Sequence, residues 1–528
     1  MRASVETLRA EATAQFEAAL ARAAAGTGGA GVEGPTLEEA AGTDPARSAR
    51  AAAAAAVRPK LAPAIAALQD GLVERDTEAR LLLLAALAGE HILFLGPPGT
   101  AKSELGRRLA RLTDGAFFER LLTRFTVPEE LFGPLSMAAL ENDEYLRKTE
   151  GYLPTAAVAF VDEVFKASSA ILNALLTLLN ERLFDNGATR LPVPLLTLVG
   201  ASNELPESEE LDALYDRFLI RRQVGQVSEA GLEALLRGRG GSAGGGGGGD
   251  PPAPPPSILL TSADCAAVQA AAADVALPDG VLALLADLRS HLQAGCEPPV
   301  YVSDRRLVKA AALLRVAAAA DGRAAVALTD ALLLQHVLWQ RPGEAARVGD
   351  WLLASLGGGD GGLAAADHLF GGMFGRACLG ASARPAALPA VAADVASLRE
   401  VLEARVGALG GAAAAAAAGG GAAGSATTTA TTPTTTTRRS FWLSPDEAAA
   451  LDASLTPRLA KAAATAQALL FEAVTLEAAL AGGAEAVTLA DLLPRRWAAF
   501  IRSGDVEDVR PLGVVPGGAG GNAPYGVP

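Results

Sequence analysis

The sequence contains few aromatic residues and few cysteines, and it carries no excess of positive charge. Aromatic residues make up 5% of its 528 positions, and the cysteines are Cys265, Cys296 and Cys378. These cysteines are far apart and show no CxxC spacing, which excludes a disulfide framework or a zinc knuckle and fits a reducing compartment. The net charge of −14 argues against a general affinity for nucleic acid or for an anionic membrane.

A long apolar run is also missing. The run Leu81–Leu87 is far too short to cross a bilayer. Glu6, Glu11 and Glu17 give the N-terminus an acidic content that transit peptides lack. These observations predict a soluble intracellular protein with no membrane span. The cytoplasm is the simplest compartment, and an organelle stroma or matrix stays open.

Half of the residues are hydrophobic, and the chain is long enough for about two to four domains. Changes of composition along the chain predict its segments. These are an Ala-rich, partly disordered N-terminal extension (1–60), an α/β domain (61–237), a Gly/Pro-rich insertion (238–256), a helical domain (257–355), a low-complexity linker region (356–440) and a helical C-terminal segment with a tail (441–528).

Short apolar runs in the α/β domain predict strands that are buried on both faces. The runs are Ile92–Leu95, Ala116–Leu122, Val158–Val161, Leu195–Val199 and Phe218–Ile220. Ahead of the fourth run, Asn186-Gly187 favours a type I′ turn and hence a hairpin. Strands that alternate with helices predict an α/β fold with a doubly wound parallel sheet, and residues 257–355 add a helical domain.

The first of these strands leads into a glycine-rich loop and then a helix. The loop consists of Gly96, Pro97, Pro98, Gly99, Thr100, Ala101, Lys102 and Ser103. Backbone N–H groups and the positive end of the helix would form a phosphate cradle, in which Lys102 reaches the β/γ-phosphates and Ser103 ligates Mg²⁺. The alternative is a Pro/Gly turn beside an ordinary lysine, which does not explain the order strand, loop, helix. Ala101 stands where the usual pattern has Gly, and a methyl group fits there if the residue has helical φ/ψ.

The strand Val158–Val161 ends in a pair of carboxylates, Asp162 and Glu163. Asp162 would hold Mg²⁺ through water, and Glu163 would polarise the attacking water. Such a pair is common after an apolar run, but this one has its own strand and follows the phosphate loop by about sixty residues. Asn203 ends a further strand and would orient the same water; alone it would be a turn residue. The sequence therefore predicts nucleoside triphosphate hydrolysis.

Two arginines outside the loop each allow two interpretations. Arg217 is either a solvated helix charge or, in a ring, an arginine finger that reaches the neighbour's nucleotide. Arg305 follows Ser303-Asp304 at the start of a helix in the helical domain. It either closes onto the γ-phosphate from this lid or caps and pairs locally.

Together these features resemble the AAA+ ATPases, and within them the MoxR family and its RavA-like group of chaperone-type ATPases. The resemblance covers residues 71–318 through the stretches GLVERDTEARLLLLAALAGE, GPPGTAKS, EELFGPLS, EGYLP, FVDEVFKASSAILNALLTLLNER, VGASNELPE, ALYDRFLIR and YVSDRRLVKAAALLRVAA. It does not extend past about residue 351. The family shares the alanine at position 101.

The resemblance implies a role for each candidate residue. Lys102 and Ser103 would belong to Walker A, and Asp162 and Glu163 to Walker B. Asn203 would be sensor 1, Arg217 the arginine finger and Arg305 sensor 2. Residues 133–154 would be the helix-2 insert, and the Asn186-Gly187 turn would head the pre-sensor hairpin.

The resemblance also implies an activity. The protein would be an Mg-ATP-dependent, chaperone-like remodeller or assembly factor for protein complexes. It would form a homo-oligomeric ring, most simply a hexamer, and would act with a client or adaptor such as a von Willebrand A-domain protein. The alternative is a nucleic-acid motor of the same clade, favoured only by Arg182 and Arg190 beside the hairpin turn and opposed by the acidic balance. A degenerate nucleotide-binding scaffold is disfavoured because the catalytic positions are intact.

Overall fold

The computed structural model describes residues 2–26, 35–206, 208–237, 254–358, 363–383, 385–418, 440–483 and 485–502. The chain forms two compact units, which are described separately. The core unit comprises residues 33–356 and 438–451, and the helical unit comprises residues 1–32, 357–437 and 452–528. Most of the predicted Gly/Pro insertion, the Thr-rich part of the predicted linker and the predicted tail lie outside the described residues.

The core unit is built on a parallel sheet with strand order β2-β3-β6-β1-β7. Its strands are β1 (His91–Leu95), β2 (Phe117–Leu121), β3 (Val158–Asp162), β6 (Thr197–Ser202) and β7 (Phe218–Gln223). Each predicted strand is therefore confirmed, with β6 shifted by two residues at its start. The strands β1, β3 and β6 are almost entirely buried because helices cover both faces of the sheet.

Alternate residues of β1 point to opposite faces of the sheet. Leu93 and Leu95 share a core with α9, whose Ile171, Leu175 and Leu178 are buried. On the other face, α6 approaches so closely that a Cβ at Gly106 would lie 2.8 Å from the Phe160 ring. The helices of this α/β part are α4 (Arg58–Gln69), α5 (Asp76–Ala88), α6 (Lys102–Leu112), α7 (Pro128–Phe132), α8 (Met137–Leu140), α9 (Ser169–Glu181), α10 (Glu209–Tyr215) and α11 (Glu229–Leu236).

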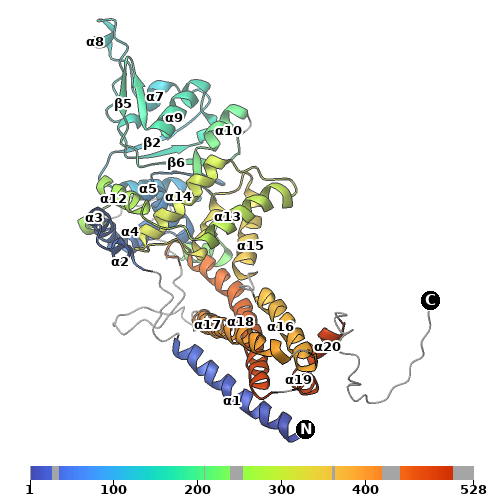
Figure 1. Cartoon of the computed structure of the whole chain (residues 1–528). Helices are drawn as coiled ribbons and strands as arrows, with labels where there is room; N and C mark the ends of the chain where they lie inside the picture. Colours follow the sequence, from blue (N-terminus) through green and yellow to red (C-terminus); the bar gives the residue numbers. More distant parts are fainter. Residues whose placement is uncertain are drawn as a thin grey trace, which may run out of the picture. The chain divides into compact units, whose positions relative to one another are not determined.

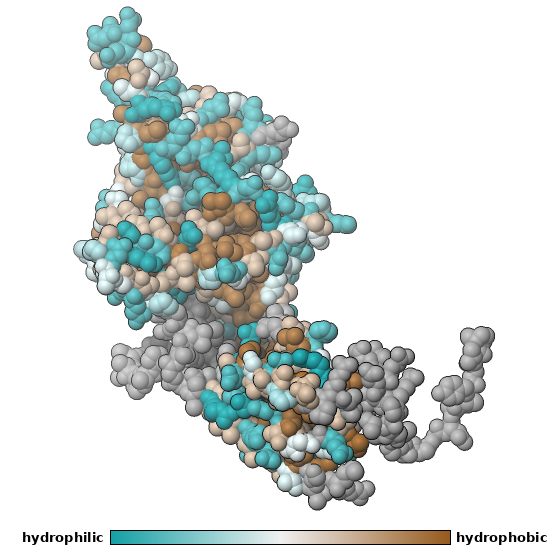
Figure 2. Space-filling view, viewed as in Figure 1, coloured by the Kyte–Doolittle hydropathy of each residue, from teal (hydrophilic) through white to brown (hydrophobic). Residues whose placement is uncertain are grey.

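A predicted hairpin and a predicted insert contact each other. The hairpin consists of β4 (Leu183–Asn186) and β5 (Thr189–Pro192), and only Gly187 of its two loop residues has a positive φ, which is the type II′ pattern, so the predicted type I′ turn is wrong. Asn186 is the last residue of β4 rather than a loop residue, and its side chain bonds both backbone groups of Arg147 in the insert. The insert projects from the sheet with α8 at its outer end, which is mainly hydrophilic (Figures 1 and 2).

The lid consists of helices that follow the sheet. They are α12 (Ser262–Ala272), α13 (Asp279–Ser290), α14 (Asp304–Ala320) and α15 (Pro342–Gly358), with a 3-10 helix at Leu328–His336. Residues 1–60 were predicted to be one extension outside the folded domains. In the structure, α2 (Leu37–Ala41) and α3 (Pro45–Ala55) are part of the core unit. Helix α3 packs on α12 through buried Ala51 and Ala54, and Arg50 forms an ion pair of 2.7 Å with Asp274. Small side chains suffice here because the helices lie close together.

Residues 440–451 also belong to the core unit, although the sequence groups them with the C-terminal segment. Trp442 is buried, and its Nε1 donates to the Ala317 carbonyl over 3.0 Å. Glu447 lies 2.7 Å from His336. Burial opposes ionisation of Glu447, but its bonds to His336 and Ser444 outweigh that effect and lower its pKa to about 2. Residues 440–451, which follow the Thr-rich stretch, therefore pack against the lid.

The helical unit contains α1 (Arg2–Gly26), α16 (Leu363–Ala383), α17 (Leu388–Ala418), most of α18 (Pro445–Ala481), α19 (Ala486–Leu492) and α20 (Pro494–Arg502). Its core includes Phe370, Phe374 and Leu470. Helices α16 and α17 occupy much of the stretch predicted as a linker, so that prediction is wrong for these residues. Alanine and glycine dilute the apolar pattern there, but Phe370, Phe374 and the valines and leucines of α17 recur often enough to bury one face.

Two helical stretches are long and apolar enough to cross a membrane by length and composition, which the sequence analysis did not predict. They are residues 45–69, which span α3 and α4, and α18. Both have packed partners within the described structure: residues 45–69 contact α12, and the apolar side of α18 lies in the core of the helical unit. This packing is typical of core helices, so neither stretch is good evidence for a membrane span.

Candidate functional site

The loop that follows β1 depends on residues without a side chain. A Cβ at Gly96 would lie 2.1 Å from the Val224 carbonyl oxygen, so only glycine fits between the loop and the end of β7. Gly99 has a φ of 79° and Ala101 a φ of 65°, both in the left-handed region. The expectation of helical φ/ψ at Ala101 is therefore wrong. A left-handed residue with a Cβ costs about 1–2 kcal/mol, which explains why glycine is usual at this position.

Lys102 is the first residue of α6 and is buried. Its Nζ donates to the carbonyls of Gly96 and Pro97 over 2.7 and 2.8 Å, so the ammonium lies inside the curve of the loop. Burial lowers the pKa of Lys102, while the charges of Asp162 and Glu163 raise it. These carboxylates are thus close enough to act on the lysine charge. Ser103 is the next residue in the first turn of the same helix.

Arg75, which was not among the predicted site residues, binds the backbone of the glycine-rich loop. Arg75 is buried, and its guanidinium donates to the carbonyls of Thr100 (3.1 Å) and Gly225 (2.8 Å). Thr100 in turn donates its hydroxyl to the Pro97 carbonyl over 3.0 Å. The loop is therefore tied both to itself and to the chain beyond β7. The quoted stretch GLVERDTEAR contains Arg75, but no spacing rule in the sequence marks it as a partner of the loop.

The carboxylate pair and the amide, which were predicted from two separate segments, meet at the same edge of the sheet. Asp162 ends β3, and Asn203 follows β6, which pairs with β3. The Asn203 Nδ2 donates to the Glu163 Oε1 over 2.8 Å, and the Lys166 Nζ lies 3.3 Å from the other oxygen. Glu163 has a φ of 50°, a left-handed conformation that carries strain for a residue with a side chain. This carboxylate is therefore oriented by defined partners.

Arg217 lies at the opposite edge. The parallel register of β1 and β7 pairs His91 with Phe218 and Leu95 with Gln223. Arg217 precedes Phe218, whereas the glycine-rich loop follows Leu95. A strand of five residues spans roughly 16 Å. Arg217 therefore cannot take part in the site that its own chain forms around Lys102.

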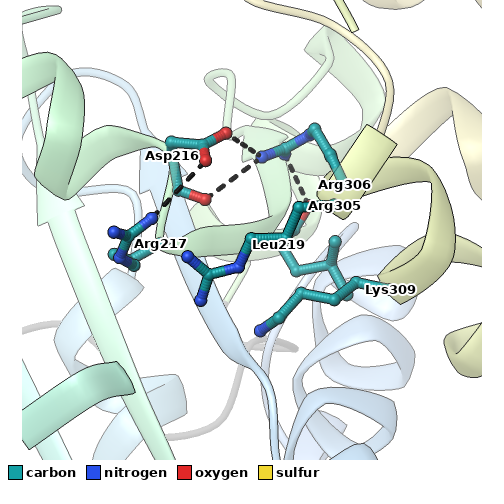
Figure 3. Close-up of a pocket in the computed structure, with 6 residues that line it drawn as sticks. All are labelled: Asp216, Arg217, Leu219, Arg305, Arg306 and Lys309. Atoms are coloured by element: carbon teal, nitrogen blue, oxygen red, sulfur yellow. Dashed lines mark hydrogen bonds and ion pairs between the residues drawn. The ribbon is translucent and has the colours of Figure 1, made fainter. Parts of the chain in front are cut away.

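Arg305 lies beside Arg217, not over the glycine-rich loop. A pocket is lined by Asp216, Arg217, Leu219, Arg305, Arg306 and Lys309 (Figure 3). Arg305 donates to the Asn180 Oδ1 over 3.0 Å, and Lys309 forms an ion pair of 2.7 Å with Glu90, the residue before β1. The geometry thus disagrees with the expectation that Arg305 closes onto its own chain's γ-phosphate.

The pocket has an excess of positive charge. Asp216 is its one acidic lining residue, and it pairs with Arg306 at 3.4 Å and with Arg217 at 3.6 Å. Burial lowers the pKa of Arg217, and the charge of Arg305 lowers it further. Neighbouring like charges that are partly withdrawn from water favour the binding of an anion. Lys309 could have been found from the sequence, since it lies four residues after Arg305 and hence on the same helix face.

Two family models match the chain. Residues 59–243 match the MoxR domain in the MoxR-vWA-beta-propeller ternary systems, and residues 280–352 match an AAA lid domain. Two uncharacterized proteins of Methanocaldococcus jannaschii, MJ0079 and MJ0812, are each 40% identical, over 274 and 279 residues; each alignment covers 52% of this chain and 68% or 70% of the relative. Chaperone MoxR1 of Mycobacterium tuberculosis is 31% identical over 164 residues, which are 30% of this chain and 41% of MoxR1.

The chain belongs to the MoxR family of AAA+ ATPases. The MoxR model matches the sheet and the glycine-rich loop, and the lid model matches α13 to α15. The predicted family and fold class are therefore confirmed. The matching model is described for systems with vWA and beta-propeller partners, so the RavA-like group stays a prediction.

The hairpin arginines of this MoxR-family chain have structural partners. Arg182 is largely buried, which lowers its pKa to about 10, and it donates to the carbonyls of Gly89 and Leu196. Arg190 pairs with Asp185 and Glu181 at 2.6 and 3.1 Å. The arginines that favoured nucleic-acid binding are thus engaged within the chain.

Proposed function

We propose that this MoxR-family chain hydrolyses Mg-ATP as a subunit of a homo-oligomeric ring, and that the ring remodels or assembles protein complexes. The observation that carries this proposal is the division of charged groups between two edges of one sheet. Lys102, Asp162 and Glu163 lie where the carboxyl ends of the parallel strands meet, which we call the carboxyl edge. The pocket with Arg217 and Arg305 lies where their amino ends meet, which we call the amino edge. A site that needs both groups requires two copies of the chain.

The carboxyl edge fits a nucleoside triphosphate. The glycine-rich loop curves around the Lys102 ammonium, which is already held by loop carbonyls that a phosphate would replace. Ser103 and Asp162 offer the hydroxyl and carboxylate oxygens that Mg²⁺ prefers, and the ion would neutralise phosphate charge. Glu163, oriented by Asn203, is the group that would take up the proton of the attacking water.

The amino edge fits the charge that develops during phosphoryl transfer. Arg217 and Arg305 lie in one pocket, so we propose that both act on the nucleotide of the neighbouring subunit. An arginine supplied in this way can increase turnover by roughly 10³–10⁵ because the charge it stabilises is greatest in the transition state. This proposal assigns Arg305 to the neighbour's site and replaces the sequence-based expectation of a role in its own.

The family model supports a protein partner. The matching model describes a family of MoxR domains in MoxR-vWA-beta-propeller ternary systems, and Chaperone MoxR1 is a relative. We therefore propose a von Willebrand A-domain protein as the adaptor and a protein complex as the client. A nucleic-acid motor is less well supported, because Arg182 and Arg190 are paired within the chain and the net charge is −14.

Mixing of inactive subunits tests the proposal. Arg217→Ala retains an intact nucleotide site and Lys102→Ala retains an intact pocket, so the two proteins should be nearly inactive alone and regain ATP turnover when mixed. Turnover that stays at the background level at every mixing ratio, with both proteins folded and the wild type active, would contradict a site shared between subunits. A turnover per subunit that is independent of protein concentration, together with a monomeric mass in ATP, would contradict the ring.

A further inference from the structure

Two buried arginines surround the short segment that carries Arg217. Arg306 is 3% exposed and Arg221 is fully buried. The carboxylate that contacts either guanidinium is Asp216, at the margin of hydrogen-bond distance from Arg306. Charges of this kind are rarely placed in a core without paired carboxylates. The remaining partners of both guanidinium groups are chiefly backbone carbonyls, and most of these carbonyls belong to residues 215–219.

Arg306 connects the lid to the start of β7. Its Nη2 donates to the carbonyls of Phe218 and Leu219 over 3.1 and 2.8 Å, and its Nη1 lies 3.4 Å from the carbonyl and the carboxylate of Asp216. Its Nε donates to the Val337 carbonyl over 2.7 Å. One guanidinium on α14 therefore binds the backbone on both sides of Arg217.

Arg221 binds the same segment from within β7. Its Nη2 donates to the Tyr215 carbonyl over 2.9 Å and its Nε to the Phe218 carbonyl over 3.2 Å. Its guanidinium stacks on the Tyr215 ring at 3.6 Å, and its Nη1 reaches the Trp339 carbonyl in the lid. Burial lowers the pKa of Arg221 to about 9, which still leaves it charged at neutral pH. The segment is thus bound by two planar groups with several donors each.

We propose that Arg306 and Arg221 are positioning residues for Arg217: they clamp the backbone of residues 215–219 to the lid and so set where the Arg217 guanidinium lies at the subunit boundary. The inference rests on the proposed role of Arg217 in a neighbouring site. It goes beyond that role because it assigns a function to two buried arginines whose guanidinium groups bind the backbone of their own chain. It also means that a movement of the lid displaces Arg217, since α14 and the Val337–Trp339 carbonyls hold the other side of the clamp.

Other bonds along the segment agree with this arrangement. The carbonyls of Tyr215, Asp216, Phe218 and Leu219 all accept from the clamp, and the Arg217 N–H donates to Leu214 over 3.0 Å. The hydroxyl of Tyr215 donates to the Gln340 carbonyl over 2.6 Å, a further tie to the chain after the lid's 3-10 helix. The Nε of Arg217 itself has no hydrogen-bond partner among the described residues. The backbone is therefore held by several hydrogen bonds, whereas the Arg217 side chain has a long ion pair of 3.6 Å with Asp216.

Hydrogen exchange of the full-length chain tests the clamp directly. In Arg306→Lys a single ammonium cannot reach all the carbonyls that the guanidinium bridges. We expect the amides of residues 214–219 to exchange at least about tenfold faster, and those of the glycine-rich loop to be unchanged. Arg323→Lys is the matched control, because Arg323 is a partly buried lid arginine that pairs with Asp321 and Asp330 instead. If Arg306→Lys does not fold, Arg221→Lys serves in the same experiment.

Mixed-subunit turnover tests the consequence. Arg306→Lys should bind ATP with unchanged affinity and lose roughly 10²-fold in kcat, the scale of a misplacement of about 1 Å. It should regain activity when mixed with Lys102→Ala, which supplies an intact Arg217. It should gain nothing when mixed with Arg217→Ala, because neither protein then supplies a correctly placed arginine. A residue needed only for folding would regain activity with neither partner.

Each other result overturns the inference. If the amides of residues 214–219 exchange at the wild-type rate in Arg306→Lys, the buried arginines do not hold this segment. Faster exchange with wild-type kcat shows a clamp that does not position Arg217. Recovery with Arg217→Ala, but not with Lys102→Ala, places the defect in the chain's own nucleotide site. If Arg217→Ala itself turns over like the wild type, the proposed function fails and the positioning role fails with it, while the exchange result still decides whether the clamp exists.

Discussion

The two edges of the sheet hold their charged groups in different ways. At the carboxyl edge, Lys102 is bound to carbonyls and Glu163 has Asn203 and Lys166 as partners. At the amino edge, Arg217 and Arg305 lie in one pocket whose acidic lining residue is Asp216. The carboxyl edge is thus largely neutralised within the chain, whereas the amino edge keeps an excess of positive charge.

This difference suggests what each edge lacks. The carboxyl edge has the glycine-rich loop and an oriented carboxylate, but the arginine that contacts the loop, Arg75, is bound to the backbone carbonyls of Thr100 and Gly225. The amino edge has arginines but no phosphate loop. Since parallel strands separate the two by roughly 16 Å, one copy of the chain cannot combine them. We infer that the active unit is a pair of neighbouring subunits.

The largest effect should come from removing Arg217. Arg217→Ala should lower ATP turnover by roughly 10³–10⁵ with unchanged ATP affinity, because the guanidinium acts on charge that develops in the neighbour's transition state. Steady-state turnover and a direct binding assay measure the two quantities. Arg237→Ala is the control, since Arg237 is exposed and forms an ion pair with Glu233 on its own helix turn. Equal losses of ATP turnover in Arg217→Ala and Arg237→Ala would contradict a special role for Arg217 at the amino edge.

At the carboxyl edge, Glu163→Gln should bind ATP normally and hydrolyse it roughly 10²–10⁴-fold more slowly, the usual contribution of a positioned general base. The amide oxygen of glutamine can still accept from Asn203, so the local structure should persist. Single-turnover hydrolysis with bound ATP measures the chemical step. Turnover near the wild-type value would show that another group activates the water.

Lys102→Ala should act on binding. The ammonium would make charge-assisted hydrogen bonds to the phosphates, each worth about 1.5–3 kcal/mol, so we expect ATP affinity to fall by at least about 10². A direct binding titration measures it, with Lys166→Ala as a control because Lys166 contacts Glu163 and not the loop carbonyls. Unchanged affinity in Lys102→Ala would contradict the cradle.

The smallest expected effect is on stability. Ala101→Gly should stabilise the fold by about 0.5–1 kcal/mol, because a left-handed φ costs alanine about 1–2 kcal/mol and the greater freedom of glycine in the unfolded chain offsets about 0.4–1 kcal/mol of this. Denaturant unfolding with each variant measures the change. Ala101→Val should destabilise, since a β-branched residue is poorer still at positive φ. A loss of stability in Ala101→Gly would contradict the left-handed conformation.

Secondary structure was predictable where the apolar pattern of the sequence is strong, and it was not predictable where this pattern is weak. The strands were found because runs such as Ile92–Leu95 are apolar at every position and bounded by glycine or charge. Helices α16 and α17 were missed because alanine and glycine make up much of both, so their apolar residues stand too far apart to show a clear period. The conformation of Ala101 was also missed, since nothing in its neighbours distinguishes a right-handed from a left-handed alanine.

The parallel sheet and the glycine-rich loop after its first strand were predictable from the sequence, which also marked Lys102, Asp162, Glu163 and Asn203 as candidate site residues. These depend on short-range order: a strand, its end and the polar residue that follows. The edge of the sheet at which each arginine lies, and the burial of Arg306 rather than Arg305, depend on long-range packing. These neighbours on one helix have different surroundings because helical rotation points the Arg306 guanidinium at the β7 backbone and leaves Arg305 exposed beside Asn180, and that direction depends on how α14 packs.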